Sequence, residues 1–328
     1  MRLLPDETIE VKSPAQLATM REAGLVTAAA LRAAVAAIEP GISTAELDAI
    51  AEREIRAAGA IPSFLGYHGF PATICASVND QIVHGIPSPQ QVLGAGDLIS
   101  VDCGAIVDGW HGDAAVTIRV TPDAATAKSG QRALGTREDG EDPEDEVAGL
   151  LDACEGALWH GLAQAVPGHR LGDISHAIEQ AARAAGPYGI IREYTGHGIG
   201  AQMHMDPPVP NFGRAGRGPV LSAGMTLAIE PMLVLGRAET LLLDDDWTVV
   251  TADGSWAAHF EHTVAVTEAG PWVLTSEDGG ASGFARLLAG GRVTEASPRS
   301  LAAGNGQAAL AGAIRTTGTA SEGARHGI

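Results

Sequence analysis

The chain has 328 residues, of which 45% are hydrophobic, and it carries a formal net charge of −19 at pH 7. A chain of this length can bury a large core, and such an acidic surface repels nucleic-acid phosphates, so we expect no DNA-binding role. The sequence has no long apolar stretch, no export signal and no CxxC pair among its three cysteines, which predicts no membrane partner and a cytoplasmic location.

Two helices are predicted at the start of the chain. Ser13 can cap the first helix, and Gln16, three residues later, can complete a capping box. Apolar residues at helical spacing extend this helix toward Ile38. A second capping-box pattern begins at Ser43, and Gly59 is expected to end that helix.

Three strands rich in β-branched residues are predicted next, at 72–78, 98–107 and 110–120. The dipeptide Asp108-Gly109 is a strong signal for a two-residue hairpin turn. With that turn, Asp113 lies opposite Gly104, and Asp102 lies opposite Ala115. The two aspartates become diagonal neighbours on one face, roughly 7 Å apart or a little less. Metal ions about 3.5–4 Å apart would fit between them. On these residues alone, two surface aspartates beside a turn remain an equal alternative.

The second half of the chain repeats the order of helices followed by strands. Helices are predicted near 147–165 and 173–185, and a strand-rich block covers 220–267. This order predicts an α+β fold with two comparable halves and is not typical of a βαβ dinucleotide-binding fold.

The domain organisation follows from composition. We expect a single catalytic domain at 1–278, interrupted by an acidic insert at about 123–146 that forms a solvated loop. Residues 279–328 are rich in Gly, Ala, Ser, Thr and Arg, which predicts a low-complexity, disordered tail.

One histidine and two glutamates in the second half suit a metal site. His197 lies in the glycine-rich run 195–200, where the backbone can approach closely and the imidazole can point into a cavity. Glu230 and Glu261 lie at strands that look buried, where a carboxylate must pair, protonate or bind a metal. Together with Asp102 and Asp113, the four carboxylates balance two divalent ions, and oxygen-rich ligand sets suit hard first-row metals.

These segments, taken together, resemble the type I methionine aminopeptidases over about residues 8–275. The resemblance is carried by Asn79-Asp80-Gln81-Ile82-Val83-His84-Gly85-Ile86-Pro87, Asp102, His111-Gly112-Asp113, Thr195-Gly196-His197-Gly198-Ile199-Gly200, Ile229-Glu230-Pro231 and Glu261-His262-Thr263. It implies the pita-bread fold, in which two pseudo-symmetric α+β halves surround a dinuclear metal site. Too few residues separate His204 from Glu230 for the helical insertion of the type II enzymes.

The resemblance also implies roles for individual residues. The implied metal ligands are Asp102, Asp113, His197, Glu230 and Glu261. The implied catalytic residues are His84, His204 and Glu230. The pocket for the methionine side chain is implied to consist of soft or aromatic groups bounded by a histidine, namely Phe64, Tyr67, Phe70, Cys75, His84, Met203 and Trp247.

The implied activity is metal-dependent removal of the N-terminal methionine from nascent proteins and peptides, with a preference for a small second residue. The implied cofactors are two divalent ions (Co, Mn, Fe or Zn), bridged by Asp113 and Glu261. A metal-bridging hydroxide would attack the scissile carbonyl, with Glu230 as general base and His204 stabilising the oxyanion. The implied partners are the N-terminal Met of peptides and nascent chains, and the ribosome; we expect a monomer.

Two alternatives were weighed against this interpretation. An Xaa-Pro peptidase or creatinase relative would usually carry a sizeable N-terminal domain, and only about ten residues precede the first predicted helix here. A catalytically inactive pita-bread protein that acts as a binding module would usually have lost ligands, whereas all five are present.

Overall fold

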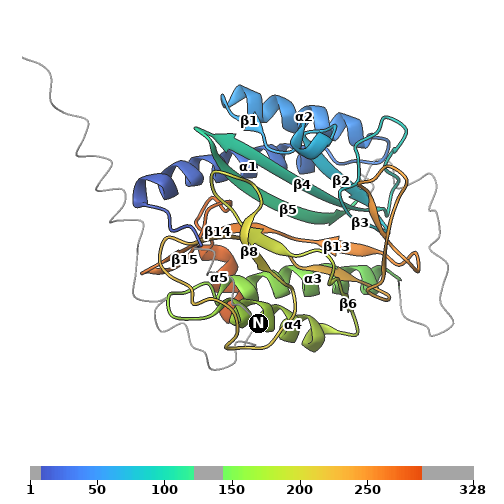
Figure 1. Cartoon of the computed structure of the whole chain (residues 1–328). Helices are drawn as coiled ribbons and strands as arrows, with labels where there is room; N and C mark the ends of the chain where they lie inside the picture. Colours follow the sequence, from blue (N-terminus) through green and yellow to red (C-terminus); the bar gives the residue numbers. More distant parts are fainter. Residues whose placement is uncertain (1–8, 122–142, 290–328) are drawn as a thin grey trace, which may run out of the picture.

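Two pairs of helices cover the strands from opposite sides in the computed structural model, which describes residues 9–121 and 143–289 (Figure 1). The first pair is α1 (Pro14–Ala36) and α2 (Thr44–Ala57), and the second is α3 (Pro143–Leu162) and α4 (Leu171–Ala185). The predicted capping boxes at Ser13 and Ser43 are both present, which confirms the two N-terminal starts. None of the helices in the described ranges is long and apolar enough to cross a membrane.

The strands of the first half are β1 (Ile61–Pro62), β2 (Ile74–Val78), β3 (Gln81–Val83), β4 (Leu98–Val107) and β5 (Trp110–Arg119). Those of the second half are β6 (Gly189–Ile190), β7 (Gly196–Gly198), β8 (Met205–Val209), β9 (Thr226–Ile229), β10 (Met232–Val234), β11 (Thr240–Leu242), β12 (Val249–Thr251), β13 (Ala257–His259), β14 (His262–Thr267) and β15 (Gly270–Val273). Within the described residues, β4 pairs with β1, β2 and β5, and the largest sheet has the order β15-β14-β9-β7-β8.

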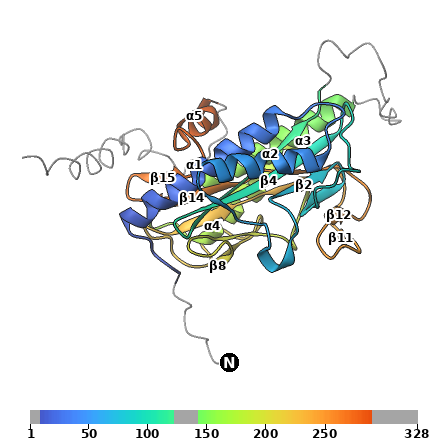
Figure 2. The same ribbon diagram turned by 90° about the horizontal axis from the view of Figure 1, so that it is seen from above.

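The helix pairs enclose two separate hydrophobic cores. Seen from above, α1 and α2 lie over β4 and β2 (Figure 2), and Leu47, Ile55, Ile74 and Ile99 are fully buried between these layers. The second core packs α3 and α4 against the strands of the other half. This arrangement matches the predicted α+β fold with two comparable halves.

The hairpin of β4 and β5 has the predicted register. Gly104 lies opposite Asp113, and Asp102 lies opposite Ala115. Asp108 and Gly109 both have positive φ angles, 47° and 82°, as a tight hairpin turn requires. The two aspartates are therefore diagonal neighbours on one face of the hairpin, and the prediction is confirmed.

The free edge of β5 joins the two halves. Ala115 and Glu261 exchange backbone hydrogen bonds of 3.3 and 2.9 Å. Two residues earlier, the Asp113 N–H donates to the Thr263 hydroxyl at 3.0 Å, and that hydroxyl donates to the Asp113 carbonyl at 2.8 Å. In the same way, the Thr117 hydroxyl accepts the His259 N–H at 2.8 Å and donates to the His259 carbonyl at 2.7 Å. We call these contacts between β5 and residues 259–263 the seam.

Three expectations differ from the structure. The helix expected at 147 begins at Pro143. The helix expected at 173 begins at Leu171, because Asp173 lies inside the first turn, where its carboxylate accepts the Arg170 N–H at 2.7 Å. Residues at the start of the predicted tail form helix α5 (Ala281–Ala289), which is stabilised by packing of the Phe284 ring edge-on against Trp159. The rest of the tail and most of the acidic insert lie outside the described residues.

Helix α1 touches β5 on one side and the residues after β15 on another so closely that each contact requires a glycine. A Cβ atom on Gly112 would lie 2.7 Å from the Gly24 backbone nitrogen, and a Cβ on Gly24 would overlap the Leu274 carbonyl oxygen. The atoms met by an added Cβ are backbone atoms, so a larger residue could be accommodated only if the packed elements moved apart.

We therefore predict that Gly24→Ala lowers the free energy of unfolding by about 1–3 kcal/mol. The matched control is Gly156→Ala, at a glycine of α3 that faces open space; it should raise stability by about 0.5–1 kcal/mol. Denaturant unfolding measures both changes. Equal effects of the two substitutions would contradict the proposed close packing.

Candidate metal centre and active site

The five predicted ligands come from five separate segments. Asp102 lies on β4 and Asp113 on β5, while His197 lies on β7. Glu230 follows β9 directly, and Glu261 lies between β13 and β14, where the seam holds its backbone against β5.

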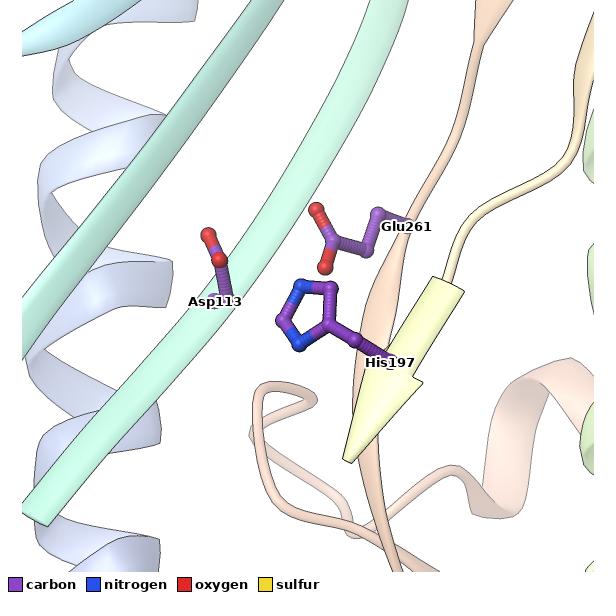
Figure 3. A group of neighbouring side chains, drawn as sticks. All are labelled: Asp113, His197 and Glu261. Atoms are coloured by element: carbon purple, nitrogen blue, oxygen red, sulfur yellow. The ribbon is translucent and has the colours of Figure 1, made fainter. Parts of the chain in front are cut away.

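Three of these side chains converge on one point. Ligand atoms of Asp113, His197 and Glu261 all lie within 4.8 Å of one another, and all three residues are buried. Figure 3 shows the three side chains pointing toward one another across the gap between the two halves. The other two ligands border this group: Glu230 Oε1 lies 3.6 Å from His197 Nε2, and the Asp102 carboxyl contacts that of Asp113.

Unpaired oxygen atoms indicate that this cluster is built for cations. Asp102 Oδ1, Asp113 Oδ1 and Glu261 Oε1 are buried and have no hydrogen-bond partner among the described residues. An isolated buried carboxylate oxygen is costly, because no water replaces its lost hydration. Divalent cations satisfy such oxygens, and a set of four carboxylates with one imidazole suits first-row metals. The residues present therefore fit a metal site.

The imidazole of His197 is oriented for ligation. Its Nδ1 lies 2.9 Å from the Gly198 carbonyl oxygen, so Nδ1 carries the proton that this bond requires. Nε2 then carries a free lone pair, and this atom faces Glu230 and the carboxylate cluster. A ligating histidine with its other nitrogen bound to a carbonyl is a common arrangement in metal sites. Burial lowers the His197 pKa to about 3, which keeps the ring neutral.

Burial raises the pKa of every carboxyl in the cluster, and repulsion from neighbouring carboxylates adds to this for Asp102, Asp113 and Glu261. The pKa of Glu230 rises to about 8 and that of Asp102 to about 7, in both cases mainly through burial. Burial followed by repulsion from neighbouring carboxylates raises the pKa of Asp113 and Glu261 well above the ordinary range. Without cations these groups hold protons, and cations would displace them.

The two predicted catalytic histidines lie beside the cluster. The His204 ring is 4.3 Å from the His197 ring, and its Nδ1 is 2.9 Å from the Tyr67 hydroxyl. His84 follows β3 with a positive φ of 60°, a strained conformation for a non-glycine residue that is often found at functional sites. Burial, followed by the nearby His259 and His204, lowers the His84 pKa to about 4.

The residues predicted to bind a methionine side chain form one apolar cluster. Phe64, Phe70, Cys75 and Met203 are buried together, with Tyr67 and Trp247 packed against them. The Phe70 and Trp247 rings meet edge to face at 5.1 Å, and the His84 ring lies 6.2 Å from Trp247. The register places Cys75 opposite Asp102, so this apolar cluster adjoins the carboxylates.

Sequence reasoning missed two histidines near the cluster. His259 Nε2 lies 3.6 Å from Glu230 Oε2, and His111 Nδ1 lies 3.1 Å from the Ser63 hydroxyl. Both histidines precede a predicted ligand by two residues in an extended segment. Because side chains two apart share a face of a strand, this spacing was a signal for their position.

Comparison with known proteins agrees with this geometry. The model of metallopeptidase family M24 matches residues 18–268. Methionine aminopeptidase 1 of Mycobacterium tuberculosis (strain CDC 1551 / Oshkosh) is 54% identical over 279 residues, which cover 84% of this chain and 97% of that protein. The crystal structure of methionine aminopeptidase from Thermotoga maritima has a TM-score of 0.74 at 38% identity, covering 82% of this chain and all of that chain.

A more distant structure shows the shared architecture alone. Prolidase from Pyrococcus furiosus has a TM-score of 0.59 at 21% identity, covering 81% of this chain and 65% of that chain. The pita-bread fold expected from the sequence is thus confirmed. The higher identity lies with the methionine aminopeptidases and not with the Xaa-Pro peptidases that were the alternative. The chain therefore belongs to metallopeptidase family M24 and, within it, to the methionine aminopeptidases.

Proposed function

We propose that the protein removes the N-terminal methionine from peptides and nascent chains, with two divalent ions held by Asp102, Asp113, His197, Glu230 and Glu261. The observation that carries this proposal is the cluster of buried, unpaired carboxylate oxygens next to an apolar cluster of aromatic and sulfur-containing side chains. Asp113 and Glu261, which lie on the two segments that the seam joins, would both be ligands of the metal site. Asp102 would hold one ion, and His197 with Glu230 would hold the other.

The bound ions, which we expect to be Co, Mn, Fe or Zn, would supply Lewis acidity and lower the pKa of a water molecule. The chain itself positions the substrate. The apolar cluster of Phe64, Tyr67, Phe70, Cys75, Met203 and Trp247 receives the methionine side chain and excludes water from it. A narrow site beyond this cluster would favour a small residue after methionine.

Four side chains handle hydrogen bonds and protons. Glu230, buried beside the cluster, accepts the proton of the attacking water and passes it to the leaving amine. His204 Nδ1 lies 2.9 Å from the Tyr67 hydroxyl; in the proposed mechanism Nδ1 accepts from that hydroxyl, and the proton on Nε2 bonds the developing oxyanion. His84, at the border of the pocket, bonds the scissile amide nitrogen.

The cellular setting is part of the same proposal. Three free, buried cysteines suit a reducing compartment, and we place the enzyme in the cytoplasm as a monomer that acts on nascent chains at the ribosome. Co-sedimentation of the full chain with purified bacterial ribosomes tests the last point. Failure to pellet with ribosomes at low salt would remove ribosome association from the proposal.

The His204 role predicts a loss in turnover without a loss of metal. His204→Ala should lower kcat on a Met-Gly peptide by about 10²–10³, since an oxyanion donor is removed. Metal affinity, measured by calorimetry, should stay unchanged. Tyr67→Phe should show a smaller loss, because the proton on His204 is no longer directed to Nε2. The control is His176→Ala on α4, which should retain activity; wild-type turnover in His204→Ala would contradict the assignment.

The raised carboxyl pKa values predict a pH-dependent stability that metal abolishes. Without metal, the folded protein keeps protons on Asp102 and Glu230 up to about pH 7 and 8, whereas the unfolded chain loses them near 3.8 and 4.5. The folded state binds more protons, so the free energy of unfolding falls as pH rises to about 8. Burial lowers the pKa values of the buried histidines from 6.5, so these groups change the pH dependence of the free energy of unfolding only below about pH 6.5.

Thermal melting between pH 6.5 and 8.5 isolates the carboxyl contribution. Protein in chelator should lose stability steadily across this range, and protein loaded with Mn(II) should not. Glu230→Gln should show a shallower slope in chelator, because one titrating group is gone. Identical slopes with and without Mn(II) would show that the carboxyl cluster does not bind the metal.

A further inference from the structure

We propose that His259 is a positioning residue that holds the Glu230 carboxylate in the orientation needed for metal binding, an inference that rests on the proposed function. His259 is only 2% exposed, and its Nε2 atom has no hydrogen-bond partner among the described residues. That atom lies 3.6 Å from Glu230 Oε2. A buried imidazole nitrogen without a partner is costly, and the Glu230 carboxylate is an acceptor beside it, while the Asp102 carboxyl also lies close enough to interact with the ring.

The Glu230 carboxylate lies between two imidazoles, one on each oxygen. Oε1 faces His197 Nε2 at 3.6 Å, and Oε2 faces His259 Nε2 at the same distance. The two histidines have different tasks, because His197 has its proton on Nδ1 and offers a lone pair at Nε2. A proton on Nε2 of His259 gives the complementary partner, a donor, to Oε2. Closing that distance on metal binding would hold one carboxylate oxygen at His259, and the other would be left to point at the His197 side of the centre.

The backbone of His259 is fixed by contacts on both edges. On one side, the Thr117 hydroxyl accepts the His259 N–H at 2.8 Å and donates to its carbonyl at 2.7 Å. A second hydroxyl, that of Ser100, lies 2.8 Å from Thr117 Oγ1 and steadies it. On the other side, β13 places His259 opposite Met232, two residues beyond Glu230. Glu230 lies in the short connection between β9 and β10, next to this pair, and its carboxylate reaches the His259 ring.

The geometry favours a donor over a sixth metal ligand. His259 is outside the group of Asp113, His197 and Glu261, whose ligand atoms converge within 4.8 Å, as Asp102 and Glu230 are. What distinguishes His259 is that its ring nitrogen lies beside an oxygen of a proposed ligand, which can accept its proton. Its free nitrogen faces Glu230, on the side of the carboxylate away from His197. Partners of this kind, which bond a ligand and not the metal, typically change metal affinity by about 10–100-fold when they are removed.

Two amide substitutions test the role with matched chemistry. In His259→Gln the terminal amide reaches the position of Nε2 and can still donate to Glu230. In His259→Asn the amide is one carbon shorter and cannot reach. Calorimetric titration of the metal-free full chain with Co(II) or Mn(II), and the visible absorption spectrum of the Co(II) form, report on the site without an activity assay.

We expect His259→Gln to bind metal within about threefold of the wild type and to keep its Co(II) spectrum. We expect His259→Asn and His259→Phe to bind at least one ion about 10–100-fold more weakly, with a changed spectrum. Thermal melts of the metal-free variants control for folding. The comparison of the two amides remains decisive if the Phe variant does not fold.

Three results would overturn the inference. Equal affinities and spectra for the Gln and Asn variants would show that the hydrogen bond to Glu230 is unimportant. Complete loss of one ion from both amide variants would identify His259 as a metal ligand. Failure of the wild type to bind any divalent ion would instead overturn the proposed function itself, so the two failures are distinguishable.

Discussion

The seam between β5 and residues 259–263 is the contact on which the rest of the site depends. The backbone bonds of Ala115 with Glu261, and the hydroxyl bonds of Thr263 and Thr117, fix how the two halves meet. Asp113 and Glu261 lie on these two joined segments, so their separation is set by strand pairing and not by flexible side chains. Rigid elements of this kind hold ligands more accurately than loops do.

The seam concentrates negative charge where water is excluded. Four carboxyl groups with raised pKa values meet at the junction, and three of their oxygens have no protein partner. Such a cluster destabilises the metal-free fold, because each buried oxygen has lost its hydration. Bound cations would reverse that cost, so stability and metal affinity are two aspects of one arrangement. The cost is tolerable because a separate hydrophobic core under each helix pair stabilises each half.

Much of this arrangement could be predicted from the sequence, for identifiable reasons. The Asp108-Gly109 turn determines the hairpin register, and the register alone places Asp102 and Asp113 on one face. The capping boxes determine the starts of α1 and α2. The convergence of His197 and Glu261 with Asp113 could not be derived this way, because it depends on the seam, where side-chain hydroxyls take part in four of the six hydrogen bonds. Only resemblance to a family pointed to it.

Other features escaped prediction because they depend on long-range packing. Helix α5 has weak local signals, and the Phe284 contact with Trp159 stabilises it. His259 reads as an ordinary residue of a buried strand until its nitrogen is found to face Glu230. The metal centre at the seam is therefore tested most directly by crystals grown with Mn(II) and an anomalous difference map. Two peaks between Asp113 and Glu261, one next to Asp102 and one next to His197 and Glu230, are predicted. A map without density among these carboxylates at saturating Mn(II) would contradict the account.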